Sequence, residues 1–171
     1  MDNIKILIDE KTIEKRIEEL ANQIMNDYKN QTITLICILK GAIYFTTELS
    51  KRIKNEVELE FMRVSSYGNE TESSGKINVK LDLDKDITGK NIIIIEDIID
   101  TGRTLFYLRN YLLTKNPASL KICTLLDKKE RRVCDIEADY VAFSVPDKFI
   151  VGYGMDNAEK CRNLPYIGYI E

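Results

Sequence analysis

Three carboxylates lie within five residues of one another in the segment 91–105, which reads N-I-I-I-I-E-D-I-I-D-T-G-R-T-L. They belong to Glu96, Asp97 and Asp100. Like charges at this spacing repel and raise one another's pKa, so the cluster requires a partner that relieves the repulsion. A bound cation, a shared proton or a ligand rich in hydroxyl groups would do so.

The residues that follow these carboxylates could bind a phosphate group. Thr101 and Thr104 carry hydroxyl groups on either side of Gly102 and Arg103. Glycine admits unusual dihedral angles, and the first turn of a following helix offers free N–H groups to an anion. Carboxylates that could bind hydroxyl groups and a metal ion thus lie beside donors that could bind phosphate. A sugar phosphate needs both. A solvated turn between a strand and a helix would have a similar composition, so these residues alone leave both alternatives open.

The elements that position this cluster follow from hydrophobic patterning. Residues 92–95 are four isoleucines without a helical or alternating period, which predicts a central strand of a parallel sheet, buried on both faces, with the carboxylates just past its end. Leu105, Leu108, Leu112 and Leu113 keep helical spacing after the turn. Similar patterns predict strands at 4–8, 32–39, 57–66, 77–81, 119–126 and 138–145, with helices from 10 to 28 and from about 42 to 54. The chain is therefore expected to be an α/β protein with a mostly parallel sheet flanked by helices.

Composition excludes several classes of function. The 171 residues suit one domain, and a net charge of −3 gives no general attraction to nucleic acid or to an anionic membrane. The chain has no histidine, which removes Ser-His and Cys-His catalysis and the usual zinc sites, and leaves proton transfer to carboxylates, lysine, tyrosine or water.

Targeting signals and cysteines point to one compartment. No signal peptide or membrane-spanning run is recognisable, so a cytoplasmic location is expected. The four cysteines show no C-x-x-C spacing and are expected to be reduced.

Two lysines follow predicted strands, at the edge of the sheet where α/β folds bind ligands. Lys40 and Gly41 come after the strand at 32–39, and Lys128 comes after the strand at 119–126. An ordinary turn remains an alternative for the first pair. Lys128 opens the run D-K-K-E-R-R, whose other cations are expected to form a solvated face.

The stretch 67–76, Y-G-N-E-T-E-S-S-G-K, has no periodicity and reads either as a linker or as a mobile loop over the site. Because the flanking segments look like paired strands of one domain, we expect a loop that closes over the site and excludes water.

These motifs together resemble the phosphoribosyltransferase family, in its branch that uses 6-oxopurines. They are L-K-G at 39–41, S-Y at 66–67, E-D-I-I-D-T-G-R-T at 96–104, L-D-K at 126–128 and P-D-K-F-I-V-G-Y-G-M-D-N-A-E-K-C-R-N-L-P-Y-I-G at 146–168. The resemblance covers nearly the whole chain. It implies a type I phosphoribosyltransferase fold in a single domain, 1–171, with a core at about 9–145, a small hood from about 1–8 and 146–171, and a mobile loop at about 66–77.

The resemblance also implies an activity. The family transfers the 5-phosphoribosyl group of 5-phospho-α-D-ribosyl 1-diphosphate to hypoxanthine or guanine with Mg²⁺, and gives IMP or GMP plus diphosphate in purine salvage. Homodimers or homotetramers are usual, and neither nucleic acid nor a membrane is an expected partner. The peptide bond before the lysine of the L-K-G loop is often cis in the family.

Residue roles carry over position by position. Asp100 matches the general base, Lys128 the donor to the 6-oxo group, and Phe149 the ring that stacks on the purine. The implied purine-binding residues are Lys128, Phe149, Ile150 and Asp156, and the implied metal ligands are Glu96, Asp97 and Asp156. The implied phosphoribosyl diphosphate site comprises Lys40, Gly41, Ser66, Tyr67, Glu96, Asp97, Asp100, Thr101, Gly102, Arg103, Thr104 and Arg162.

Two rival functions remain open at this point. A regulator of this fold that senses phosphoribosyl diphosphate and binds RNA or DNA would need a basic face or an added DNA-binding domain, and the chain has neither. A transferase for xanthine, adenine or a pyrimidine is the second rival. Lys128 and Phe149 favour a 6-oxopurine, because an ammonium group has only donors and suits a carbonyl oxygen.

Overall fold

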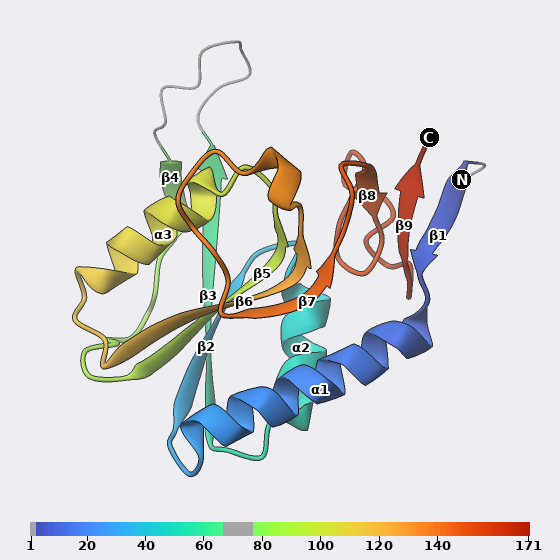
Figure 1. Ribbon diagram of the computed structural model, residues 1–171. Coiled ribbons are helices and arrows are strands. Elements are labelled where there is room, and N and C mark those ends of the chain that lie inside the picture. The colour runs from blue at the N-terminus through green and yellow to red at the C-terminus, as the bar shows by residue number, and fades with distance from the viewer. Residues whose placement is uncertain (1–2, 67–76) are drawn as a thin grey trace.

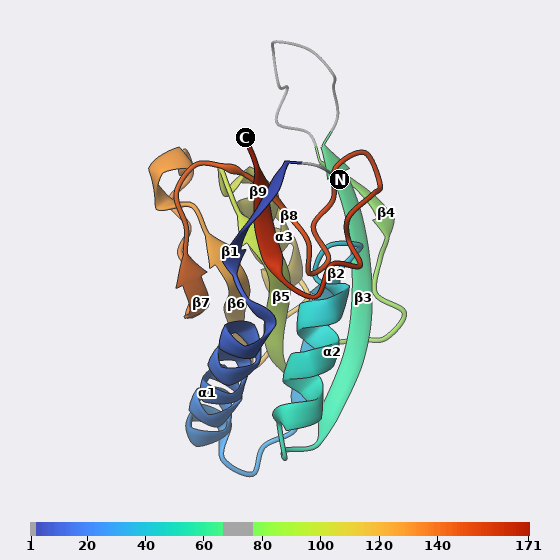
Figure 2. The ribbon, with the colours of Figure 1, turned by 90° about the vertical axis from the view of Figure 1, so that its right-hand side faces the viewer.

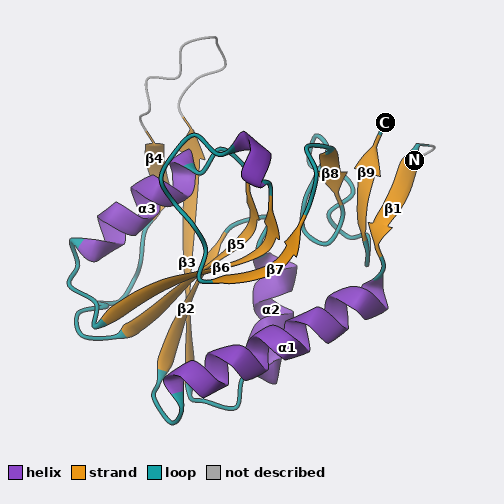
Figure 3. Ribbon diagram, in the orientation of Figure 1, coloured by secondary structure: helices purple, strands orange, loops and turns teal. Residues whose placement is uncertain are grey.

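The computed structural model describes residues 3–66 and 77–171. Strands and helices alternate along most of the chain (Figure 1, Figure 3). Their order is β1 (Ile4–Ile8), α1 (Glu10–Tyr28), β2 (Ile33–Ile38), α2 (Ile43–Arg52), β3 (Val57–Ser66), β4 (Ile77–Leu81), β5 (Asn91–Ile99), α3 (Arg103–Leu113), β6 (Ser119–Asp127), the 3₁₀ helix η1 (Lys129–Arg131), β7 (Tyr140–Ser144), β8 (Phe149–Val151) and β9 (Ile167–Ile170).

The main sheet has six strands in the order β4-β3-β2-β5-β6-β7. Strands β3, β2, β5, β6 and β7 are parallel, and β4 runs antiparallel to β3 at one edge. Helices α1 and α2 lie on one face of this sheet and α3 lies on the other, as the two ribbon views show (Figure 1, Figure 2). The predicted fold class is therefore confirmed.

The isoleucine run of β5 fills both layers of the core. Ile93 and Ile95 belong to the cluster that packs under α1 and α2, whereas Ile92 and Ile94 belong to the cluster under α3. All four are fully buried. Alternating side chains of a strand point to opposite faces, so a strand covered on both sides must be apolar at every position. This strand forms the floor from which the polar residues that follow it project.

Helices α1 and α3 form where the pattern predicts them, and one predicted packing residue of α3 is exposed. The Asp9 side chain accepts a hydrogen bond from the Thr12 backbone N–H at 2.8 Å and so caps α1. Leu105, Leu108 and Leu112 of α3 are buried, but Leu113 is 44% exposed. Each helical residue turns by about 100°, so Leu113 has left the face that Leu112 buries.

A second, three-stranded antiparallel sheet of order β1-β9-β8 joins the two ends of the chain. It stands beside the main sheet, next to the strand end of β7 (Figure 1, Figure 2). Ile150 and Ile167 are buried in the same cluster as the α1 and α2 residues, which fixes this hood sheet on the core. In the part of the chain that the structure describes, no helix has the length and apolar character needed to cross a membrane.

Candidate active site

The paired acids lie inside β5 rather than beyond it, which corrects the expected end of the strand. Pairing with β6 continues to the register Ile99–Asp127, so Glu96 and Asp97 are strand residues. Glu96 is buried, and its burial, followed by repulsion from Asp97, raises its pKa well above the ordinary value. Burial also raises the pKa of Asp97, although the charge of Arg162 and nearby hydrogen bonds oppose this shift.

Three segments meet around Gly41, in the turn between β2 and α2. A Cβ atom on Gly41 would lie 1.7 Å from Asp97 Oδ2, and one on Gly154 would lie 2.0 Å from the Gly41 carbonyl oxygen. The peptide bond between Leu39 and Lys40 is cis. A side chain at 41 would force either the turn or the Asp97 carboxylate to move, so glycine permits this close approach.

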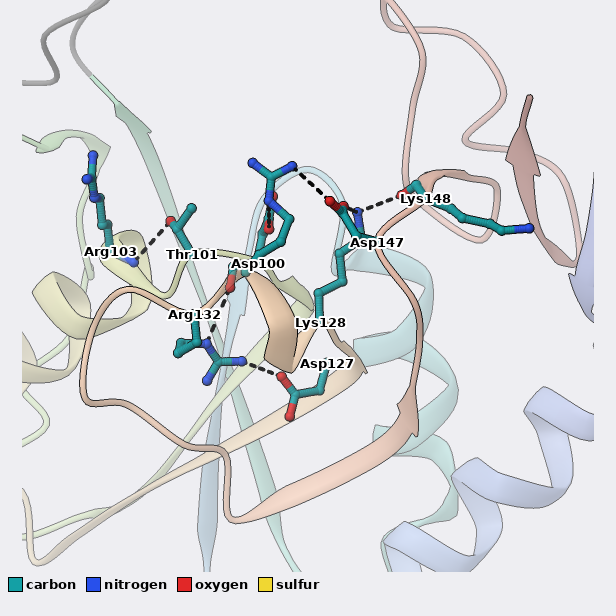
Figure 4. A network of polar contacts seen from close by, with 9 residues as sticks. Asp100, Thr101, Arg103, Asp127, Lys128, Arg132, Asp147 and Lys148 are labelled. Atoms are coloured by element: carbon teal, nitrogen blue, oxygen red, sulfur yellow. Dashed lines mark hydrogen bonds and ion pairs between the residues drawn. The ribbon is translucent and has the colours of Figure 1, made fainter.

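The turn after β5 carries the hydroxyl groups and leads directly into α3. Gly102 is the N-cap residue of α3 and has φ +83°, a left-handed conformation that favours glycine. Glycine has no side chain, so no side-chain cap bonds the first N–H groups of the helix. Thr101 Oγ1 accepts a long hydrogen bond of 3.5 Å from the Arg103 N–H (Figure 4). Thr104 is half-buried in the first turn of the helix. The turn with unusual dihedral angles at Gly102 and the helix after it, which the sequence predicts, are confirmed.

A cavity of about 250 Å³ opens between the carboxyl end of β5, β6 and the hood sheet. Six residues that the sequence predicts for the site line it, together with Ile98 and Met155. The six are Asp97, Asp100, Lys128, Phe149, Ile150 and Asp156. The segments that carry them are far apart in the sequence, so the fold brings the predicted purine-binding residues together with two of the acids.

Phe149 and Lys128 present an aromatic face and an ammonium group to this cavity. Phe149 is the first residue of β8 and is 55% exposed, more than any other phenylalanine of the chain. Lys128 is buried, and its Nζ donates to the Lys148 carbonyl oxygen at 2.6 Å and lies 3.5 Å from Asp147 Oδ1 (Figure 4). Because an ammonium group has three N–H donors, these contacts leave donor capacity for a ligand in the cavity.

The expected solvated face at Lys129, Arg131 and Arg132 is confirmed for Lys129 and Arg131, which are exposed, and is wrong for Arg132, whose side chain is only 15% exposed. Arg131 Nε lies 2.9 Å from Asp100 Oδ1 and Arg131 Nη1 lies 3.5 Å from Asp147 Oδ2. Arg132 pairs with the buried Asp127, and its Nε donates to the Asp100 carbonyl oxygen at 3.3 Å (Figure 4).

The helix η1 accounts for this arrangement, because it turns the chain back toward β5. The sequence did offer one signal for the pair of Arg132 and Asp127. The arginine comes five residues after an aspartate that closes an apolar strand.

Arg162 and Lys40 pair with acids of the loop between β8 and β9, which also carries the cavity residue Asp156. Arg162 Nη2 lies 2.8 Å from Asp156 Oδ1, and its Nη1 donates to the Gly154 carbonyl oxygen at 2.7 Å. Lys40 reaches the same loop, where its Nζ lies 2.8 Å from Glu159 Oε2. Two residues predicted to bind diphosphate thus flank the cavity, and the contact with Glu159 was not predicted.

The predicted metal ligands do not form a preformed cage. Among the described residues, no three or more cysteine, aspartate or glutamate side chains converge on one metal position. Mg²⁺ is commonly held by one or two carboxylates together with substrate phosphate oxygens. Glu96 and Asp97 are adjacent acids that repel each other, and this fits a cation of that kind, which would arrive with a polyphosphate ligand.

The remaining predicted residues surround the cavity without lining it. Gly41 touches Asp97, and the turn at 101–104 follows Asp100 directly. Glu96 is buried in β5, next in sequence to the lining residue Asp97. Ser66 ends β3, and Tyr67 and the predicted loop at 67–76 lie outside the described residues.

The fold and this site define a nucleotide-forming transferase class, and comparison with known proteins agrees. Residues 3–158 match the family model described as the phosphoribosyl transferase domain. Hypoxanthine-guanine phosphoribosyltransferases of Streptococcus thermophilus and Bacillus subtilis are 50% and 48% identical over 98% of this chain and 93% of each relative. A crystal structure of the Bacillus anthracis enzyme of that name superposes with a TM-score of 0.95 at 48% identity, covering 99% of this chain and 100% of that one.

These matches confirm the resemblance that the sequence motifs predicted. The chain therefore belongs to the phosphoribosyltransferase family, and within it to the hypoxanthine-guanine group.

Proposed function

We propose that this protein transfers the 5-phosphoribosyl group of 5-phospho-α-D-ribosyl 1-diphosphate to a 6-oxopurine, hypoxanthine or guanine, and releases diphosphate. The products are IMP or GMP, so the reaction serves purine salvage. The observation that carries this proposal is the shared cavity, where Asp100, Lys128 and Phe149 line one space. The names of relatives that are about half identical over nearly their whole length support the same reaction.

The activated ribose would lie between the turn at 101–104 and the acids of β5. The helix N-terminus and the hydroxyl groups of Thr101 and Thr104 suit the 5′-phosphate, because they combine N–H donors with the positive end of a helix dipole. The carboxylates of Glu96 and Asp97 accept hydrogen bonds from ribose hydroxyls. Lys40 and Arg162 provide positive charge for the diphosphate at the other end of the sugar.

Asp100 is placed to accept a proton during the transfer. As the bond from the anomeric carbon to the diphosphate oxygen breaks, the imidazole-side nitrogen of the purine bonds to that carbon and its proton moves to the Asp100 carboxylate. Asp100 lines the same cavity as Phe149 and is held by Arg131 at 2.9 Å. A positioned general base contributes about 10²- to 10⁴-fold in rate.

Selectivity for a 6-oxopurine follows from the donors of Lys128. The ammonium group can bond a carbonyl oxygen at position 6 but repels the N–H donors of a 6-amino group. Phe149 covers one face of the base, and the backbone at Ile150 and Asp156 runs along its pyrimidine edge. This arrangement argues against the alternative hypothesis that the protein is a transferase for adenine or a pyrimidine.

Magnesium is part of the proposal. Asp97 and Asp156 line the cavity and, with Glu96, supply the carboxylate oxygens that this ion prefers. Bound with the substrate, Mg²⁺ would neutralise the diphosphate and so assist its departure. Asp97 and Glu96 would orient the ribose hydroxyls, and Asp156 would hold Arg162 in place.

Location and assembly remain predictions. The four cysteines are free, which agrees with a reducing compartment such as the cytoplasm. A homodimer or homotetramer is expected from the family resemblance, and no nucleic acid or membrane partner is expected. The hypothesis of a nucleic-acid-binding regulator has less support, because the cavity contains both Asp100, the proposed base, and the aromatic ring of Phe149.

One assay tests the reaction. The pure protein is incubated with Mg²⁺, 5-phospho-α-D-ribosyl 1-diphosphate and, separately, hypoxanthine, guanine, xanthine, adenine or uracil, and nucleotide and diphosphate are quantified. Nucleotide with hypoxanthine or guanine and none with adenine or uracil is the expected result. Absence of nucleotide with both 6-oxopurines would refute the proposal.

A further inference from the structure

The Glu159 carboxylate bridges the two cations that flank the cavity. Its Oε2 atom lies 2.8 Å from Lys40 Nζ and 3.4 Å from Arg162 Nη2. The two cations come from the loop after β2 and the loop before β9, which are 122 positions apart in the chain. A single carboxylate oxygen therefore lies where positive charge from two distant segments converges.

The loop is built to hold this carboxylate in position. The Glu159 backbone N–H donates to Asp156 Oδ2 at 2.7 Å, while Asp156 Oδ1 pairs with Arg162. Ala158 and Glu159 have φ of +49° and +65°. Residues other than glycine adopt such angles only at an energetic cost, so the surrounding contacts must maintain them. The conformation that brings Glu159 to the cations is thus imposed by the loop.

Arg162 retains unused donor capacity in this arrangement. Its Nε atom is buried and has no hydrogen-bond partner among the described residues, although its two other nitrogens are bonded. A buried donor without a partner is destabilising, and a ligand with acceptor oxygens would satisfy it. Glu159 is 65% exposed at its side chain and Lys40 is 46% exposed, so the carboxylate can leave without disrupting the core.

We propose that the Glu159 carboxylate is an internal counter-anion that occupies the diphosphate position between Lys40 and Arg162 until a diphosphate group displaces it. This inference rests on the proposed function, which supplies a substrate and a product with that group. A diphosphate carries more negative charge and more acceptor oxygens than one carboxylate, and it can reach the unpaired Arg162 N–H as well. Glu159 then returns as diphosphate leaves, so it weakens product binding.

Substitution of Glu159 by glutamine tests this competition. Glu159→Gln keeps the shape and removes the charge, and the variant should bind inorganic diphosphate in the presence of Mg²⁺ about 3- to 10-fold more tightly by calorimetry. The affinity for IMP should stay unchanged, because its phosphate binds at the turn 101–104. The matched control is Glu58→Gln, which removes an ion pair with Lys90 at the amino end of β3 and should change neither affinity.

A double substitution separates the specific contact from a general effect of charge. In a Lys40→Gln background, the gain from Glu159→Gln should shrink, because one of the two competing contacts is already absent. Equal diphosphate affinities in the parent protein and Glu159→Gln would overturn the inference, as would weaker binding or an equal gain for IMP. If the parent protein binds no diphosphate at all, the proposed function fails first and this inference fails with it.

Discussion

Replacement of Phe149 by alanine removes the aromatic face of the cavity with little damage to the fold. Stacking of a base on an aromatic side chain is worth roughly 1–3 kcal/mol, which corresponds to about a 5- to 150-fold loss of affinity. Complete burial of a phenylalanine contributes about 1.5–3 kcal/mol to folding. Because Phe149 is 55% exposed, the variant should lose only about half of that.

Steady-state kinetics and thermal unfolding measure these two effects separately. In Phe149→Ala the KM for hypoxanthine should rise about 5- to 150-fold while kcat changes little, since stacking acts in the ground state and the transition state alike. The melting temperature should fall by about 1–6 °C. Phe61→Ala in β3 is the matched control, because Phe61 is 40% exposed and lies outside the cavity. An unchanged KM in Phe149→Ala, or an equal rise in Phe61→Ala, would refute the stacking role.

Three further predictions concern the acids and the lysine. Asp100→Asn should lower kcat about 10²- to 10⁴-fold in the transferase assay while binding of phosphoribosyl diphosphate by calorimetry persists; unchanged turnover would exclude Asp100 as the base. Lys128→Gln should lower kcat/KM for hypoxanthine about 10- to 150-fold, which corresponds to the loss of a hydrogen bond to a charged group. The preference for hypoxanthine over adenine should also fall, and an unaltered preference would contradict the proposed contact. Glu96→Gln should stabilise the protein at neutral and higher pH. Burial and Asp97 raise the pKa of Glu96, so in the parent protein stability is full below the unfolded pKa near ~4.3 and falls as pH rises through the raised folded pKa. Melting curves should therefore favour Glu96→Gln at pH 8 and converge as the pH approaches 4, and parallel curves at all pH values would show that this shift is absent.

Local sequence patterns predicted the elements whose burial depends on their own residues. The isoleucines at 92–95 could only form a strand covered on both faces, and Asp9 marked the start of α1. These features need no knowledge of the rest of the fold.

Contacts between distant segments were beyond such patterns. The contacts of Arg131 and Arg132 were not predicted, because nothing local shows that η1 brings these side chains to Asp100 and Asp127. The bridge from Glu159 to Lys40 likewise depends on how the hood sheet sits against the β2 strand end. The end of β5 was placed too early because its pairing with β6, rather than its composition, carries the strand past the two acids.

The central claim is that one cavity holds the purine while the turn at 101–104 and the acids of β5 hold the two ends of the activated ribose. A crystal structure with Mg²⁺, 5-phospho-α-D-ribosyl 1-diphosphate and a hypoxanthine analogue whose reactive nitrogen is replaced by carbon tests it most directly. The account predicts the base stacked on Phe149, its 6-oxo group at Lys128 Nζ and the 5′-phosphate at Thr101 to Thr104. A sugar phosphate bound away from that turn, or a base outside the cavity, would contradict it.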